Sequence, residues 1–238
     1  MIVTIMQPAY LPWLGYFDRL LKSDCFVVLD HVDMDRNSKT KFTNRNRIRT
    51  SRGTKWLTVP VRSSGTSGNL PISDMRIADD SSWRRKHLAT IKENYARAAY
   101  IDTYIDFIEV SYHRDWSSLS ALCNHFTVWM MKVLGLEITT IRSSEMELAA
   151  SGSSLILEIC RQLEATAYIS GPFGRDYLRR QDFLDASINL LFHDYAHPQY
   201  SQVSGGFESH LSCLDLILNH GPSSLGILST DSTSLKSN

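Results

Sequence analysis

The sequence has no excess of charge of either sign, since 25 Lys and Arg balance 25 Asp and Glu among 238 residues. This balance excludes a generally basic nucleic-acid coat and an acidic solubilising chain. Long hydrophobic runs are also missing. The longest are strand-sized, such as 25–29 and 188–192, whereas a bilayer span needs roughly 20 residues. The first eight residues do not resemble a signal peptide, so we expect a cytoplasmic protein.

Cysteine is scarce, and its four positions form no CxxC pair. Each lies in an apolar stretch, which favours buried free thiols over disulfides or zinc ligands. Cys25 would need an exposed thiolate to carry an acyl group, and its apolar strand argues against that role. The motifs HExxH, EF-hand, P-loop and GxSxG are absent. Asp30, His31, Asp33 and Asp35 could hold a divalent ion, but a solvated acidic turn is the favoured interpretation. We therefore assign no metal and no certain cofactor.

Short apolar segments alternate with segments of helical spacing along the whole chain. The start predicts a strand at 2–6, a helix at 13–23 and a strand at 25–30, which is a βαβ pattern. Further strands are expected at 55–61, 138–141, 167–171 and 188–192, and further helices at 83–97, 99–110, 116–134, 151–163, 174–180 and 208–219. This order predicts an α/β fold: a Rossmann-like, mostly parallel sheet with an additional helical layer from residues 83–135. We expect one domain over 1–221 and a disordered tail over 222–238.

The bend after the first strand combines polar and aromatic side chains with two prolines: Gln7, Tyr10, Trp13 and Tyr16. It leads into a helix N-terminus, where backbone N–H groups favour anions. Open α/β sheets bind ligands at the carboxyl ends of their strands, where this bend lies. The bend therefore predicts a substrate frame, and a rigid turn with aromatic packing is the alternative.

Residues 36–55 contain eight Lys or Arg residues and no acid. In an extended chain, Asn44, Arg45, Asn46 and Arg47 would present donors on alternating faces. Arginine binds phosphate oxygens through a planar fork, so the segment predicts a pyrophosphate site. A solvated basic loop and a nucleic-acid patch are the alternatives.

Three residues are candidate general bases: His87, Asp30 and His31. Arg84 and Arg85 beside His87 would lower its pKa and keep it neutral at pH 7, and a neutral imidazole can accept a proton from an ammonium group. Lys86, next to His87, is a predicted substrate-binding residue. Asp30 and His31 lie at the end of the second predicted strand. Ser170 and Gly171 begin a strand-to-helix turn suited to contact with the substrate backbone.

Several of these segments together resemble the WbqC-like family of bacterial polysaccharide-biosynthesis proteins. The resemblance covers about residues 3–221 and rests on 6–18, 44–48, 56–61, 83–87, 168–178 and 207–215. It implies a role in modifying amino sugars of O-antigen or capsule. The usual proposal is transfer of a glycyl-type acyl group to a nucleotide-linked amino sugar, from a carrier thioester, an adenylate or an aminoacyl-tRNA.

The opening also resembles, more weakly, the HxGH-type nucleotidyltransferases and ligases such as pantothenate synthetase. Trp13, Leu14, Gly15 and Tyr16 stand where HxGH would stand, so only the glycine is kept. We interpret that glycine as room for a phosphate near the backbone. The missing imidazoles put adenylyl transfer in doubt.

An N-acyltransferase is therefore the expected activity. The alternatives are a non-catalytic nucleotide-sugar-binding or scaffold protein of a polysaccharide assembly complex and an adenylate-forming amide ligase. An acyl-carrier protein or tRNA is the expected donor partner, and the sequence predicts no oligomeric state. The substrate hypothesis requires the Pro-Trp bend and the arginine segment to meet in space.

Overall fold

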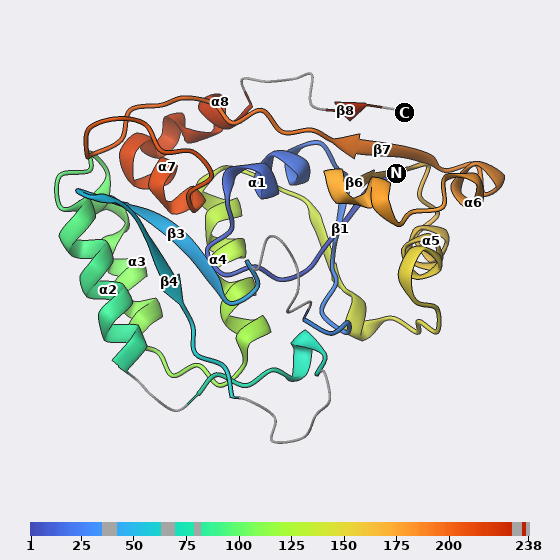
Figure 1. Ribbon diagram of the computed structural model, residues 1–238, viewed down its shortest axis with the longest axis horizontal. Coiled ribbons are helices and arrows are strands. Elements are labelled where there is room, and N and C mark those ends of the chain that lie inside the picture. Colours follow the sequence, from blue (N-terminus) through green and yellow to red (C-terminus); the bar gives the residue numbers. More distant parts are fainter. Residues whose placement is uncertain (35–41, 63–69, 79–81, 230–234, 237–238) are drawn as a thin grey trace.

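The computed structural model describes residues 1–34, 42–62, 70–78, 82–229 and 235–236 (Figure 1). Its main sheet has six strands in the order β5-β2-β1-β6-β7-β8, and all neighbours are parallel except β7 and β8. The α/β, mostly parallel prediction is thus confirmed. The strands are β1 (Ile2–Met6), β2 (Cys25–Val28), β5 (Thr139–Arg142), β6 (Ala167–Ser170), β7 (Asn189–His193) and β8 (Leu235–Lys236).

Helices cover both faces of this sheet, which explains why β1, β2 and β6 are almost wholly apolar. Alternate side chains of β1 and β2, Val3 and Val27 among them, pack against α5 (Gly152–Gln162) and α6 (Arg180–Asp185). The others, including Phe26 and Val28, pack against α1 (Leu14–Leu21). The sheet therefore separates two hydrophobic clusters.

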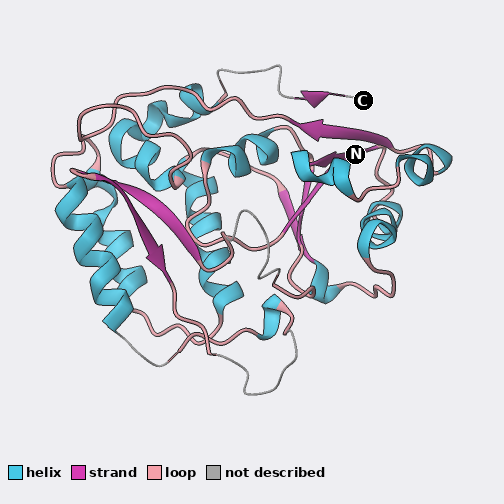
Figure 2. Cartoon of the chain, viewed as in Figure 1, coloured by secondary structure: helices cyan, strands magenta, loops and turns pink. Residues whose placement is uncertain are grey.

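The larger cluster extends into the expected helical layer, which lies beside the sheet (Figure 1). This layer contains α2 (Ser82–Tyr95), α3 (Ile101–His113) and α4 (Leu119–Val133). The later helix α7 (Cys213–His220), which the prediction did not include, packs against α3 and α4. Figure 2 shows a two-stranded hairpin within the same half of the molecule. Its antiparallel strands are β3 (Arg45–Thr50) and β4 (Gly53–Thr58), and β3 contacts α2 and α7. The described part of the arginine segment therefore packs with these helices and not in the main sheet, and its residues 36–41 lie outside the described residues.

Residues 222–229 differ from our prediction of a disordered tail over 222–238, of which 230–234 and 237–238 lie outside the described residues. A short helix, α8 (Ser224–Leu228), occupies part of the predicted disordered tail. Leu228 is buried, so an apolar anchor orders this segment despite its Ser-rich composition. Short 3₁₀ helices complete the description: η1 (Ile72–Asp74), η2 (Ser143–Glu145), η3 (Pro172–Asp176) and η4 (Gly221–Ser223).

All four cysteines are buried free thiols, as predicted. Burial raises the pKa of each thiol, that of Cys160 to about 12. The thiolate population at neutral pH is correspondingly small, and Cys25 lies fully buried in β2. The structure therefore agrees with the argument against Cys25 as an acyl carrier.

Candidate functional site

The Pro-Trp bend and the arginine strand meet, as the substrate hypothesis requires. The side-chain amide of Asn46 donates to the Leu11 carbonyl over 2.6 Å. Ser212, the N-cap of α7, donates its backbone N–H to the carbonyl of Arg47 over 2.8 Å. Ser212 also forms an isolated antiparallel bridge with Trp13. Three distant parts of the sequence thus lie side by side at the start of α1.

The outer face of the hairpin combines two arginines with an aromatic ring. Arg47 is the register partner of Trp56, whose side chain is 41% exposed. The guanidinium carbons of Arg45 and Arg47 lie 4.5 and 5.5 Å from the centre of the Trp56 ring. This arrangement is a pair of cation–π contacts. Arg47 Nε is withdrawn from solvent and has no hydrogen-bond partner among the described residues. The face can offer both cationic donors and a stacking surface.

Histidines that the sequence does not group lie around Trp13. The rings of Trp13 and His210 stack at 5.5 Å, and His197 lies 5.1 Å from His210. Burial lowers the pKa of both histidines, and the charge of Arg47 lowers that of His210 further. Both imidazoles are therefore neutral at pH 7. Sequence analysis missed His210, because no spacing connects it with a bend almost 200 residues earlier.

The glycine of the HxGH-like segment has a different role from the one we predicted. A Cβ on Gly15 would overlap the Trp13 ring, which covers the first turn of α1. Tyr16 is buried against Phe17 and Phe26. The glycine thus makes room for an indole ring, and the predicted phosphate approach is corrected. Neither Trp13 nor Tyr16 reproduces the imidazoles of HxGH.

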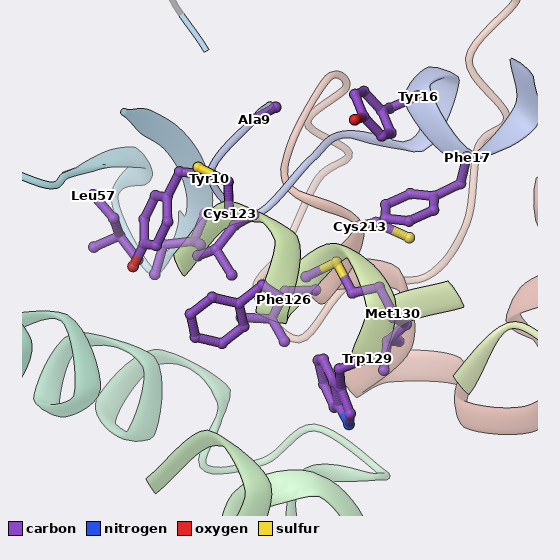
Figure 3. Close-up of a cluster of buried hydrophobic side chains, with 14 of the residues drawn as sticks. Ala9, Tyr10, Tyr16, Phe17, Leu57, Cys123, Phe126, Trp129, Met130 and Cys213 are labelled. Carbon is purple, nitrogen blue, oxygen red and sulfur yellow. The ribbon is translucent and has the colours of Figure 1, made fainter. Parts of the chain in front are cut away.

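His87 lies in the core, and this placement argues against its predicted role as the base. It is 6% exposed, and its Nδ1 hydrogen-bonds to the hydroxyl of Tyr10 at 2.9 Å. That hydroxyl also hydrogen-bonds to Tyr112. Burial lowers the pKa of His87 to about 4. The imidazole is therefore neutral at pH 7 as predicted, but mainly because it is buried and not because of neighbouring cations. Figure 3 shows Tyr10 beside Leu57 and Phe126, in the hydrophobic cluster. Tyr10 thus packs in the core, and this burial argues against its predicted role in framing a substrate.

Asp30 is also fully buried and internally bonded. Its carboxylate accepts hydrogen bonds from Ser143 and Ser144, and it forms an ion pair with Arg142 at 3.1 Å. These contacts connect the ends of β2 and β5, so the solvated acidic turn is corrected at this residue. His31 is half-buried, and its Nδ1 lies 2.7 Å from Ser143 Oγ. Of the three predicted bases, His31 alone keeps access to solvent in a loop at the carboxyl edge.

The remaining predicted binding residues divide between structural and accessible positions. Asn44 donates to the carbonyl of Val59 and closes the hairpin. Ser170 is buried and donates to the carbonyl of Gly171. Gln7 is half-buried at the end of β1. The side chain of Lys86 is exposed on α2.

The described residues contain no group of three His, Cys, Asp or Glu side chains placed to hold a metal ion. Asp35, the fourth member of the acidic cluster considered above, lies outside the described residues. In the same described part of the chain, no helix is long and apolar enough to cross a membrane.

The fold and these contacts define an α/β protein with a mostly parallel sheet and a polar, aromatic carboxyl edge. The sequence model of the WbqC-like protein family matches residues 7–227, and the chain belongs to that family. It is 34% identical over 221 residues to "Uncharacterized protein Rv1507c" of Mycobacterium tuberculosis (strain ATCC 25618 / H37Rv). The match covers 92% of this chain and 94% of that protein. No solved structure matches.

Proposed function

We propose that the protein binds a nucleotide-linked amino sugar and transfers a glycyl-type acyl group to its amine, in bacterial surface-polysaccharide biosynthesis. The proposal is carried by the face of Arg45, Arg47 and Trp56. This face adjoins the Pro-Trp bend through His210, because Arg47 Nη2 donates to the His210 carbonyl and the His210 ring stacks on Trp13. The unpaired, buried Nε of Arg47 supports an anionic ligand, because a buried donor without an acceptor costs free energy.

In this proposal the two guanidinium groups hold the pyrophosphate through charge-assisted hydrogen bonds. The exposed ring of Trp56 offers a stacking surface for the base or the sugar. His31 accepts a proton from the sugar ammonium group, and the free amine attacks the acyl carbon. The new amide bond forms as the bond to the donor's leaving group breaks. The donor is a carrier thioester, an adenylate or an aminoacyl-tRNA.

Arg45→Ala and Arg47→Ala should each weaken the binding of UDP- or dTDP-linked amino sugars. The expected loss is about 1.5–3 kcal/mol, the scale of a hydrogen bond to a charged group. Isothermal titration calorimetry measures it directly. Arg52→Ala is the matched control, because Arg52 is exposed at the turn of the same hairpin. Unchanged affinity in both test variants would remove the pyrophosphate from this face.

His31→Ala should lower turnover more than binding, because a general base contributes about 10²–10⁴-fold to rate. Mass spectrometry of the acylated sugar, run against each class of donor, gives turnover, and calorimetry gives binding. His113→Ala, an exposed change on α3, is the control. Equal turnover in His31→Ala and wild type would exclude His31 as the base.

A second candidate function is nucleotide-sugar binding without catalysis, in a scaffold of polysaccharide assembly. The burial of His87 and Asp30 favours it, because two of three predicted bases are held by internal contacts. Sugar binding without an acylated product, across all three donor classes, would select this function. The adenylate-forming ligase has less support, since Trp13 and Tyr16 replace both motif histidines.

A further inference from the structure

Arg19 lies in the last turn of α1, but its side chain reaches back to the carboxyl edge of the sheet. Its Nε donates to the sulfur of Met6, the last residue of β1, over 3.1 Å. Its Nη1 lies 2.9 Å from the point where a Cβ on Gly171 would stand. Gly171 directly follows β6. The guanidinium group therefore lies between the carboxyl ends of two neighbouring parallel strands.

This position is the switch point of the sheet. From β1 the chain passes through α1, on one face, to β2 on one side. On its other side β1 pairs with β6, which is reached through α5 on the opposite face. Where connections leave neighbouring strands in opposite directions, a crevice opens at the carboxyl edge, and α/β proteins bind ligands there.

The charge of Arg19 has no anionic partner in the described part of the chain. Its one hydrogen bond there goes to a thioether, and no described carboxylate lies within 4.0 Å. The neighbouring Asp18 is bound by Lys22 and, at 2.6 Å, by His193. Burial lowers the pKa of Arg19. A partly buried cation without a counter-ion is costly for the fold, and an anionic ligand would offset that cost.

We propose that Arg19 anchors an anion site at the β1–β6 switch point and that its ligand is a phosphate group. The planar guanidinium suits two phosphate oxygens. Gly171 has no side chain and leaves room for the guanidinium group. Tyr177, which is 51% exposed, can add a hydroxyl as a hydrogen-bond donor to the phosphate. The anion site itself does not depend on the proposed function, because a nucleotide and free phosphate present the same oxygens. Only the identity of the molecule that carries the phosphate rests on the proposed function.

Calorimetric titration with pyrophosphate and with UDP tests the site. Arg19→Met should weaken pyrophosphate binding at least about tenfold, the loss of one charge-assisted contact. Arg84→Met is the control, because Arg84, on α2, already pairs with Asp115. Weaker binding of both probes supports a nucleotide phosphate, and weaker binding of pyrophosphate alone supports free phosphate. Wild-type affinity for both probes in Arg19→Met would overturn the site, as would wild-type protein that binds neither.

Gly171→Ala tests the same site without removing the charge. Gly171 has a φ of −70°, which alanine adopts freely, while the added Cβ must displace the guanidinium. We expect pyrophosphate binding to weaken several-fold with the melting temperature nearly unchanged. Gly226→Ala is the matched control, because nothing lies within 4 Å of its added Cβ. Unchanged pyrophosphate affinity in Gly171→Ala would contradict the site even if Arg19→Met failed to fold.

The two binding hypotheses fail separately. One outcome is that Arg19→Met loses pyrophosphate binding while Arg45→Ala and Arg47→Ala bind the nucleotide-linked sugars with wild-type affinity. This outcome would support the switch-point site and exclude the hairpin site. The reverse result would remove Arg19 and leave the proposed function intact.

Discussion

Replacing Asp215 with alanine should lower the free energy of unfolding by about 3–5 kcal/mol, because three buried hydrogen bonds lose their acceptor and each buried unsatisfied group costs about 1–3 kcal/mol. Asp215 is fully buried in α7. Its carboxylate accepts hydrogen bonds from Tyr95 at 2.7 Å, Tyr200 at 3.0 Å and Gln202 at 2.9 Å. The change would remove the acceptor of two tyrosine hydroxyls and of one N–H of Gln202, whose Nε2 also donates to the Glu208 carbonyl. Each buried group left unsatisfied carries a desolvation penalty.

Urea unfolding followed by circular dichroism measures this loss. Asp115→Ala is the control: its side chain is 96% exposed and pairs with Arg84 at the surface, so we expect no measurable change. Asp215→Asn keeps an acceptor and should lie between wild type and Asp215→Ala. A loss below about 1 kcal/mol in Asp215→Ala, the scale of an ordinary hydrogen bond, would contradict the network described here.

The second large effect is a loss of stability in acid caused by His87. Burial depresses its pKa from 6.5 to about 4 in the folded protein, while the unfolded chain protonates near 6.5. The unfolded state therefore binds the proton first as the pH falls. The contribution of neutral His87 to the free energy of unfolding is complete above pH about 6.5. It is lost progressively as the pH falls towards about 4, and the total loss is about 3 kcal/mol.

His87→Gln isolates this contribution from other titrating groups. The variant should be less stable than wild type at pH 7, because the Tyr10 hydroxyl loses its imidazole partner. The difference in unfolding free energy between wild type and His87→Gln should narrow by about 3 kcal/mol from pH 7 to pH 4. The reason is that glutamine, unlike histidine, binds no proton at this position when the chain unfolds. Urea titrations at four or five pH values measure it, with the exposed His113→Gln as control. A constant difference would show that His87 is accessible to protons in the folded state.

Local pattern was enough to predict most of the fold. The strands at β1, β2, β6 and β7 were readable because a strand covered on both faces is apolar throughout. The end of α4 was readable because Gly135, with a φ of +67°, follows it. The separate hairpin was not, because the alternating arginines and asparagines of β3 resemble an exposed loop until their partners are known.

The candidate site was predicted only in part, because distant segments decide which polar residues are accessible. His87 has cationic neighbours along α2, yet its side chain is buried and hydrogen-bonds to Tyr10, which is 77 residues away in the sequence. Arg19 looks like an ordinary basic residue near the end of a helix. Only the pairing of β1 with β6 places Met6 and Gly171 around its guanidinium.

The position of β1 between β2 and β6 also affects how the chain folds during synthesis. The register pairs Ile2 with Ala167, and Ser212 joins the Pro-Trp bend from still later in the sequence. A nascent chain can build the βαβ start and the three middle helices early. It cannot close the sheet until more than two thirds of the protein has left the ribosome. Contacts this distant slow folding, so the first strand spends much of translation with one hydrogen-bonding edge open.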